Sequence, residues 1–256
     1  MEPLDGERPN AARMYDYALG GRHNTAVDRA AADDAFARFP NARHVAATNR
    51  SFLRRAVRFA ARLGVDQFLD LGSGIPTVGN VHEIAEEELT TARVVYVDVE
   101  PVAVAETERL LADAPRASAV RADLRDADVV LERARRLLDF SRPVALLAVA
   151  ALHYLGRDED VPGLLARYRA ELASGSLLAI SHTTDEHDPE GSARIRELLE
   201  RTSTPATHRS RAEVAALFAG TELVEPGVVW TPEWRPDMPD PVPAESETWC
   251  GVGIVR

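Results

Sequence analysis

The sequence predicts an α/β fold in which helices cover both faces of a doubly wound, mostly parallel sheet. From residue 64 onward, short β-branched runs alternate with longer amphipathic stretches. Residues 143–150, PVALLAVA, are apolar throughout, as expected of a strand that is covered on both faces. The last two strand-like runs have no helix between them, so they are expected to pair antiparallel.

Before residue 64 the pattern is helical. Residues 28–39 and 43–63 are predicted to form helices. Ahead of them, the stretch ARMYDYALGGRHNTAVDR combines adjacent glycines with polar and aromatic side chains. We therefore expect two parts, a helical N-terminal extension of residues 1–63 that serves as a lid, and a sheet domain of residues 64–256.

The sheet domain opens with strands that alternate with helices. The apolar and β-branched runs predicted as strands are residues 65–71, 93–98, 118–122, 143–150 and 176–182. The amphipathic runs predicted as helices are residues 78–88, 102–112, 126–138 and 159–172. This alternation indicates right-handed βαβ units whose strands run parallel.

The alternation stops after residue 182. A polar loop at residues 183–192 is followed by predicted helices at 193–201 and 211–219. Strand-like runs then follow at 222–230 and 247–255, joined by a proline-rich loop. We expect these two runs to add an antiparallel hairpin to the parallel sheet.

Composition narrows the classes of function. The chain has 256 residues and a net charge of −11, which disfavours general nucleic-acid binding. It has no lysine, which excludes a Walker A NTPase and a Schiff-base enzyme. No apolar run approaches the roughly 18–20 residues of a membrane helix. The polar start of the chain and the single Cys250 favour a cytoplasmic protein that does not contact the membrane.

The stretch QFLDLGSGIPTVGN places a glycine turn directly after the first strand of the sheet domain. Gly72, Ser73 and Gly74 match the start of the dinucleotide pattern G-x-G-x-x-G. Thr77 stands where the third glycine would be, which weakens the match to a nicotinamide or flavin site. Asp70 precedes the turn, and a carboxylate there suits a ligand with positive charge. S-adenosylmethionine, which carries a sulfonium and an ammonium group and no pyrophosphate, fits this turn.

Acidic residues also follow the next two strands. Asp98 ends the second strand. In nucleotide-binding folds of this kind, a carboxylate at that position accepts charge-assisted hydrogen bonds from the two ribose hydroxyls. Asp123 follows the third strand. Because the carboxyl ends of parallel strands line the ligand crevice, we expect Asp70, Asp98 and Asp123 to meet there. We assign them to the methionine end, the ribose and the adenine amino group, in that order. The remaining residues predicted to bind the cofactor are Thr77, Val99, Leu124, Ala150 and, in the extension, Tyr17.

Five stretches of the chain point to a family. They are ARMYDYALGGRHNTAVDRAAA, NRSFLRRAVRFAARLGVDQFLDLGSGIPTVGNVHE, ARVVYVDVEP, LLDFSRPVALLAVAALHYL and GSLLAISH. On these stretches the sequence resembles the class I S-adenosylmethionine-dependent methyltransferases, and within them the S-adenosyl methyltransferase family, formerly a domain of unknown function. The resemblance covers nearly the whole chain. It implies a seven-stranded, Rossmann-like sheet with an antiparallel last strand, S-adenosylmethionine as cofactor, and methyl transfer.

The chain departs from the family pattern at two places. It has Arg22-His23 where members usually have Lys-Asp, and Val99-Glu100 where they usually have Asn-Asp. The second change lies where the adenine ring is expected, so it bears on adenine contacts and not on the ribose grip. Asn49-Arg50 are expected either to tie the extension to the core or to contact the methionine carboxylate.

Residues for catalysis are sought beyond the fourth and fifth strands and in the extension, where Tyr15, Tyr17, His23 and Asn24 lie. The two tyrosines are expected either to stack on the cofactor or to hold the lid. In-line methyl transfer needs the nucleophile held about 3–3.5 Å from the methyl carbon. A general base is needed only where the nucleophile must lose a proton. His153 and Tyr154 directly follow the fourth strand and His182 ends the fifth, so these three are the catalytic candidates, with His153 preferred. No metal site is predicted, since His82 and Glu86 have no third ligand at a suitable spacing.

Three functions remain open. The first is a methyltransferase acting on a small molecule, which the acidic charge and the lid favour over a nucleic-acid substrate. The second is a regulatory protein that binds S-adenosylmethionine or S-adenosylhomocysteine without catalysis. The third is a nicotinamide oxidoreductase, which the missing third glycine and the terminal hairpin disfavour.

Overall fold

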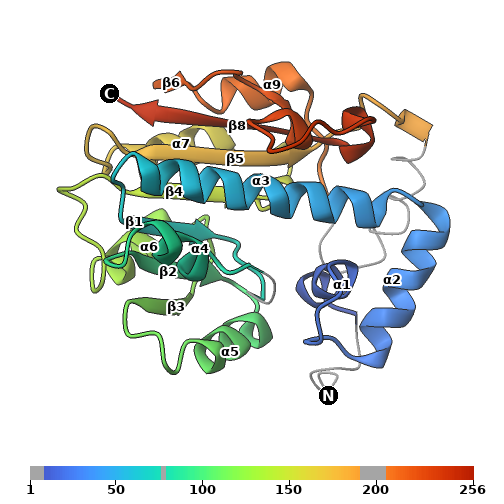
Figure 1. The fold of residues 1–256 in the computed structure, drawn as a ribbon, viewed down its shortest axis with the longest axis horizontal. Coiled ribbons are helices and arrows are strands. Elements are labelled where there is room, and N and C mark those ends of the chain that lie inside the picture. The colour runs from blue at the N-terminus through green and yellow to red at the C-terminus, as the bar shows by residue number, and fades with distance from the viewer. Residues whose placement is uncertain (1–8, 76–78, 191–205) are drawn as a thin grey trace.

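A computed structural model describes residues 9–75, 79–190 and 206–256 (Figure 1). Its centre is an eight-stranded mixed sheet in the order β3-β2-β1-β4-β5-β8-β6, with β7 paired to β8. The strands are β1 (Gln67–Leu71), β2 (Arg93–Asp98), β3 (Ala117–Arg121), β4 (Ala145–Val149), β5 (Leu177–Thr183), β6 (Thr221–Leu223), β7 (Val229–Trp230) and β8 (Thr248–Val255). The pairs among β1 to β5 are parallel, whereas β8 runs antiparallel to β5 and β6.

Helices cover both faces of this sheet (Figure 1). The α-helices are α1 (Ala11–Ala18), α2 (Ala26–Arg38), α3 (Ala42–Arg62), α4 (Val81–Glu88), α5 (Pro101–Leu110), α6 (Ala127–Ala134), α7 (Val161–Arg169) and α9 (Arg211–Ala216). The 3₁₀ turns are η1 (Leu152–Tyr154), η2 (Thr231–Glu233) and η3 (Pro243–Ser246). None of the helices in the described ranges is both long and apolar enough to cross a membrane.

The predicted α/β class and the antiparallel C-terminal pairing are confirmed, with one difference in strand number. The predicted strand at residues 222–230 is divided into β6 and β7. Pro226 has no N–H for the ladder, and Gly227 adopts a positive φ, so the run cannot stay extended. The sheet therefore has eight strands rather than seven. The predicted helix at 193–201 lies outside the described residues, as does Thr77.

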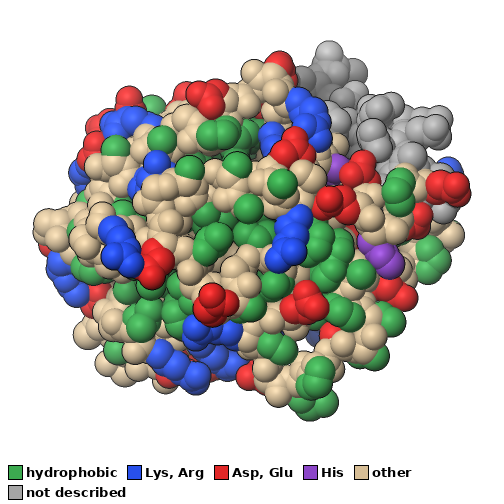
Figure 2. Space-filling view, turned by 90° about the horizontal axis from the view of Figure 1, so that it is seen from above, with side chains coloured by type: hydrophobic (Ala, Val, Ile, Leu, Met, Phe, Trp, Pro, Cys, Tyr) green, Lys and Arg blue, Asp and Glu red, His purple; other side chains and the backbone are tan. Residues whose placement is uncertain are grey.

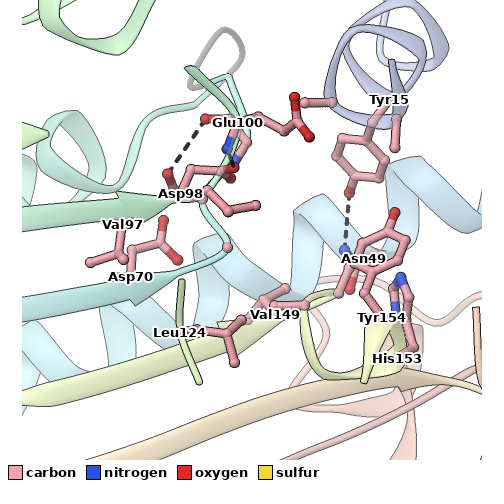
Figure 3. Close-up of a pocket in the computed structure, with 18 of the residues that line it drawn as sticks. Tyr15, Asn49, Asp70, Val97, Asp98, Glu100, Leu124, Val149, His153 and Tyr154 are labelled. Carbon is pink, nitrogen blue, oxygen red and sulfur yellow. Dashed lines mark hydrogen bonds between the residues drawn. The ribbon is translucent and has the colours of Figure 1, made fainter. Parts of the chain in front are cut away.

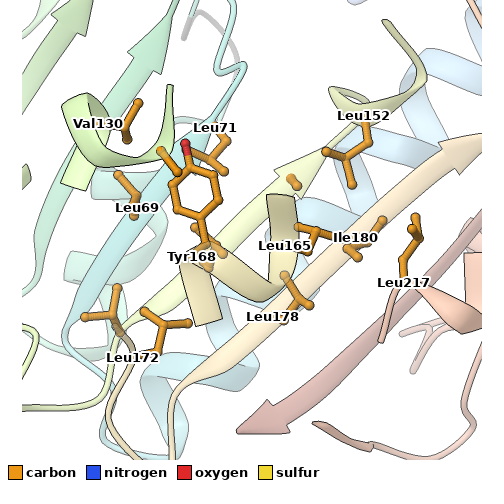
Figure 4. Close-up of a cluster of buried hydrophobic side chains, with 14 of the residues drawn as sticks. Leu69, Leu71, Val130, Leu152, Leu165, Tyr168, Leu172, Leu178, Ile180 and Leu217 are labelled. Carbon is orange, nitrogen blue, oxygen red and sulfur yellow. The ribbon is translucent and has the colours of Figure 1, made fainter. Parts of the chain in front are cut away.

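Alternating side chains build a separate core on each face of the sheet. On one face, Leu69 and Leu71 of β1 pack with residues of α6 and α7 such as Val130 and Tyr168 (Figure 4). On the other face, Phe68 packs with residues of α3 and α4. Because side chains two apart share a face, Asp70 points to the α3 side of the sheet, at the end of β1.

The predicted N-terminal extension contains two different units. Helices α1 and α2 lie beyond the carboxyl ends of the parallel strands, tied together by a buried 2.7 Å ion pair between Arg13 and Asp28 (Figure 1). Helix α3 instead runs along the sheet and buries Phe52, Ala56 and Val57 in the sheet's core. The part that reaches over the strand ends is therefore α1 and α2.

Candidate functional site

A cavity of about 520 Å³ lies at the carboxyl edge of the parallel strands, under α1 and beside α3 (Figure 3). This volume is typical of a small-molecule or cofactor pocket. Its lining extends from the segment after β3, across β2, β1 and β4, to β5 and β8. The site is built from these strand ends.

The glycine turn forms one wall of the cavity. Gly72 and Gly74 adopt positive φ values of 67° and 60°, which only glycine takes without strain. A side chain on Gly72 would also collide with Ala151, whose Cβ would lie 2.7 Å away. The N–H groups of Gly72 and Ser73 donate to the carbonyl of Val97 at 2.8 and 3.0 Å, which fixes the turn against β2. Bare backbone therefore faces the cavity.

The carboxylate of Asp98 holds the turn from the neighbouring strand. It accepts from the N–H of Gly74 at 2.7 Å and from the N–H of Glu100 at 2.9 Å (Figure 3). Burial nevertheless raises the pKa of Asp98 above its ordinary value. A carboxylate has about four lone-pair sites, so Asp98 keeps acceptor capacity toward the cavity beyond these two bonds.

Asp70 and Arg50 form a charged corner of the lining. Asp70 is 6 % exposed, and burial raises its pKa to about 7, with a further increase from Asp98 and an opposing effect from Arg50. The Nε of Arg50 is buried without a hydrogen-bond partner among the described residues. The corner can thus meet a ligand that carries one positive and one negative group.

Asp123 has a local partner. Its carboxylate accepts from the backbone N–H of Arg125 at 2.9 Å and from the guanidinium Nε at 2.9 and 3.0 Å. These bonds to Arg125 lower the pKa of Asp123. Both residues line the cavity, and the pair forms its wall beyond β3.

The amide of Asn49 links α1 to the sheet. Its Nδ2 donates to the hydroxyl of Tyr15 at 3.0 Å (Figure 3), and its Oδ1 accepts from the hydroxyl of Ser181 at 2.6 Å. The Oγ of Ser181 accepts from the N–H of Ala150 at 2.9 Å. Ala150 lines the cavity with a positive φ of 55°. This chain of bonds ties the backbone after β4 to the position of α1.

Helix α1 is held over the cavity at a second point. The Nδ2 of Asn10, the N-cap of α1, donates to the carboxylate of Glu100 at 3.1 Å, and the Oδ1 of Asn10 caps the helix. Ala11, Ala12 and Tyr15 of α1 line the cavity. The helix is therefore part of the site's wall and is bonded both to Glu100, the N-cap of α5 just after β2, and to Asn49 of α3.

His153 and Tyr154 line the opposite end of the cavity, on η1 (Figure 3). Their ring centroids lie 4.3 Å apart. Burial, followed by the charges of His182, His208 and Arg209, holds the pKa of His153 well below its ordinary value. His153 is therefore a neutral imidazole at pH 7, with one nitrogen that can accept a hydrogen bond.

His182 is not part of the lining, and both of its ring nitrogens are engaged. Its Nε2 lies 2.7 Å from Nη1 of Arg209, and a guanidinium can only donate, so Nε2 accepts. Its Nδ1 then carries the proton and donates to the carbonyl of Thr183 at 2.8 Å. Burial lowers the pKa of His182 to about 4. The predicted catalytic role of His182 has no support in this geometry.

Most of the predicted site residues share the cavity. Those found in its lining are Asp70, Gly72, Ser73, Gly74, Asp98, Val99, Asp123, Leu124, Ala150, His153 and Tyr154. Tyr17 is not among them, because its ring stacks on Phe36 and its hydroxyl donates to Asp33 at 3.1 Å.

Several lining residues were not predicted as ligand-binding residues. Arg125, Thr183 and Thr248 lie in the lining, and their only signal in the sequence is their position next to a strand end. Glu100 also lies in the lining, at the place where the adenine ring is expected. Tyr15 is one of the two tyrosines of the extension expected either to stack on the cofactor or to hold the lid, and it lies in the lining. In the part of the chain that the structure describes, no group of three or more His, Cys, Asp or Glu side chains is placed to hold a metal ion.

Two solved structures resemble this chain in both sequence and fold. A candidate methyltransferase from Thermobifida fusca YX is 41 % identical, with a TM-score of 0.92 over 99 % of this chain and 97 % of that one. A DUF574 family protein from Streptomyces avermitilis is 35 % identical, with a TM-score of 0.92 over 99 % of this chain and all of that one. No curated protein sequence matches the chain.

A more distant structure shares the fold. The 1,6-didemethyltoxoflavin-N1-methyltransferase of Burkholderia thailandensis, solved with its methyl acceptor and S-adenosylhomocysteine, is 20 % identical. Its TM-score is 0.52 over 99 % of this chain and 98 % of that one. The profile of the S-adenosyl methyltransferase family matches residues 1–256. The chain therefore belongs to this family, as an S-adenosylmethionine-dependent methyltransferase whose cofactor is S-adenosylmethionine.

Proposed function

We propose that the protein transfers the methyl group in line to a small-molecule acceptor held in the same cavity as the cofactor. The observation that carries this proposal is the single cavity that crosses the whole carboxyl edge of the sheet. The ends of β1, β2 and β3 hold the cofactor in this proposal. The acceptor then lies over the ends of β4, β5 and β8, beside His153.

The residues at the β1–β3 end fit S-adenosylmethionine. The backbone of Gly72 and Gly74 allows a close approach, and Asp98 has acceptor capacity left for the ribose hydroxyls. The charged corner matches the amino-acid end, with Asp70 toward the ammonium group and the unpaired Nε of Arg50 toward the carboxylate. The cofactor supplies a methyl group activated by a positively charged sulfur.

The protein's own groups position the reactants and exclude water. Tyr15 on α1 and Tyr154 on η1 wall the cavity where the acceptor is proposed to lie (Figure 3). Close, aligned placement of the reacting atoms supplies most of the rate increase in such a displacement. The neutral His153 is the group that can accept a hydrogen bond, or a proton, from an acceptor that carries one.

The surface favours a small acceptor over a nucleic acid. Arginine and acidic side chains are interspersed on the face in Figure 2, without one continuous basic stripe on that face. The net charge of −11 acts against phosphate backbones in the same way. A cavity covered by α1 also admits a small molecule more readily than a polymer.

Calorimetric titration with S-adenosylmethionine, S-adenosylhomocysteine and NAD tests this proposal. We expect the first two to bind and NAD not to. Asp98→Ala should weaken S-adenosylmethionine binding by about 1.5–3 kcal/mol, the range for hydrogen bonds to a charged group, or roughly 10- to 100-fold. Asp113→Ala, a change at an exposed acid outside the cavity, is the matched control. Unchanged affinity in folded Asp98→Ala would remove the ribose assignment, and binding of NAD alone would refute the cofactor half of the proposal.

A further inference from the structure

Three buried polar atoms in the cavity wall have no hydrogen-bond partner in the described part of the chain. They are Nδ1 of His153, Oγ1 of Thr183 and Oγ1 of Thr248. His153 is 6 % exposed and Thr248 is 2 % exposed. A buried polar group without a partner destabilises a fold, and few occur in a native protein. Three of them on one wall of one cavity are suited to bind a polar ligand.

The topology brings these atoms together. Thr183 and Thr248 are directly opposed in the antiparallel ladder of β5 and β8. Opposed residues place their side chains on one face, with Cβ atoms about 4.5–5.5 Å apart. His153 follows β4, the other neighbour of β5. The three atoms therefore come from three adjacent strand ends and form one polar wall.

This wall carries hydrogen-bonding capacity without charge. The charged residues of the lining are Arg50, Asp70, Asp98, Glu100, Asp123 and Arg125. All six belong to α3 or to the ends of β1, β2 and β3. The described lining from β4, β5 and β8 contributes only uncharged side chains, since His153 is neutral at pH 7.

We propose that His153, Thr183 and Thr248 form the acceptor subsite and select an uncharged small molecule with a polar edge of hydroxyl, amide or ring-nitrogen groups. Two hydroxyls and a neutral imidazole can each donate or accept, so they suit such an edge. The lining there offers a charged group no side chain of opposite charge, and burying a charge without such a partner is strongly unfavourable. The apolar side of the acceptor would face Leu155 and the ring of Tyr154. The inference rests on the proposed function and deepens it.

Matched pairs of fragments test the subsite. Nicotinamide against nicotinate, and benzamide against benzoate, differ mainly in charge. Their binding is measured by saturation-transfer NMR on the full chain saturated with S-adenosylhomocysteine. We expect the amides to bind at least tenfold more tightly than the carboxylates. The double variant Thr183→Val/Thr248→Val should weaken amide binding at least tenfold, because valine keeps the shape and removes both hydroxyls.

The structure supplies a matched control for the variants. Thr231 on η2 also has a buried Oγ1 without a partner among the described residues, but it lies outside the cavity lining. Thr231→Val should leave fragment binding unchanged. None of the three valines removes a hydrogen bond made by the described residues, so each variant should melt at the parent's temperature or above it. If the double variant fails to fold, Thr248→Val alone carries the same comparison.

The outcomes separate the two proposals. If S-adenosylhomocysteine itself does not bind, the cofactor half of the proposed function fails. If it binds, the subsite is refuted when carboxylates bind as tightly as amides, when no fragment binds, or when the double valine variant keeps the parent's affinity.

Discussion

At the scale of single residues, Asp70 makes the cavity sensitive to pH. Its pKa is raised to about 7, first by burial and then by Asp98, against the opposing effect of Arg50. The carboxyl group is thus about half ionised at neutral pH in the ligand-free protein. A cationic ligand favours the ionised form, so binding and deprotonation are coupled.

We therefore expect S-adenosylmethionine binding to release a proton from Asp70. The affinity should rise as pH increases toward about 7 and level off above it, because only the ionised carboxylate attracts the ammonium group. Calorimetry at pH 6.5 in two buffers of different ionisation enthalpy measures the released proton. Asp70→Asn should abolish the buffer dependence, and a buffer-independent enthalpy in the parent would show that Asp70 does not face the cation.

Asp70 also affects the free energy of unfolding, and its stabilising effect decreases as the pH rises. The folded protein keeps this proton up to about pH 7, whereas the unfolded chain loses it near 3.8. Stability from Asp70 is therefore fully present below the unfolded pKa and is lost as pH rises through 7. Relative to the parent, Asp70→Asn should gain free energy of unfolding between pH 5 and pH 8, by about 3 kcal/mol for the roughly two pH units below the folded pKa. Urea denaturation at the two pH values measures this, and an equal effect at both would contradict it.

At the scale of elements, α1, α3 and β5 are coupled through Asn49. The hydroxyls of Tyr15 and Ser181 are each hydrogen-bonded to the side-chain amide of Asn49. A double-mutant cycle of Tyr15→Phe and Ser181→Ala should show a coupling of about 0.5–3 kcal/mol in the free energy of unfolding. Tyr15→Phe combined with Thr231→Val, which shares no partner with it, is the additive control. Additivity in both cycles would mean that Asn49 does not couple Tyr15 to Ser181.

Helices α1 and α2 form a wall that the sheet's cores do not require. Neither of the two hydrophobic cores includes a residue before Phe52. Deleting residues 1–40 should leave a folded protein that binds S-adenosylmethionine at least about tenfold more weakly, since Tyr15 and Asn10 are lost. Far-ultraviolet circular dichroism and calorimetry on the truncated chain measure the two effects. Normal binding and turnover would show that α1 and α2 are not a lid.

How far the sequence predicts these elements depends on whether a local pattern determines them. Strands such as β4 are continuous apolar runs, so their place in a covered parallel sheet follows from composition. The meeting of Asp70 and Asp98 follows from topology alone. The choice of Tyr15 over Tyr17 does not, because side chains two apart on a helix point about 200° apart and only the docking of α1 decides between them. Thr248 lies in the site because β8 pairs with β5 in a register that places it opposite Thr183. No local sequence pattern predicts this register.

At the scale of the whole molecule, the order of the strands divides the cavity into two ends. Strands β3, β2 and β1 lie on one side of β4, and β5 and β8 lie on the other. Charged lining residues belong to the first side and to α3, whereas the described lining of the second side has only uncharged side chains. Because β8 is antiparallel, its first residue rather than its last lies at the site. The antiparallel direction of β8 thus places Thr248 in the proposed acceptor subsite.

The position of β8 also bears on how the protein is made. The ribosome adds β6 before β8, yet β8 lies between β5 and β6 in the sheet. A nascent chain that still lacks Thr248–Val255 exposes the edge of β5, an unpaired strand prone to wrong association. Pairing residue 183 with residue 248 closes a long loop, which is a slow kind of contact to form. The acceptor wall and the protected sheet are therefore completed together, when this late strand enters the gap left for it.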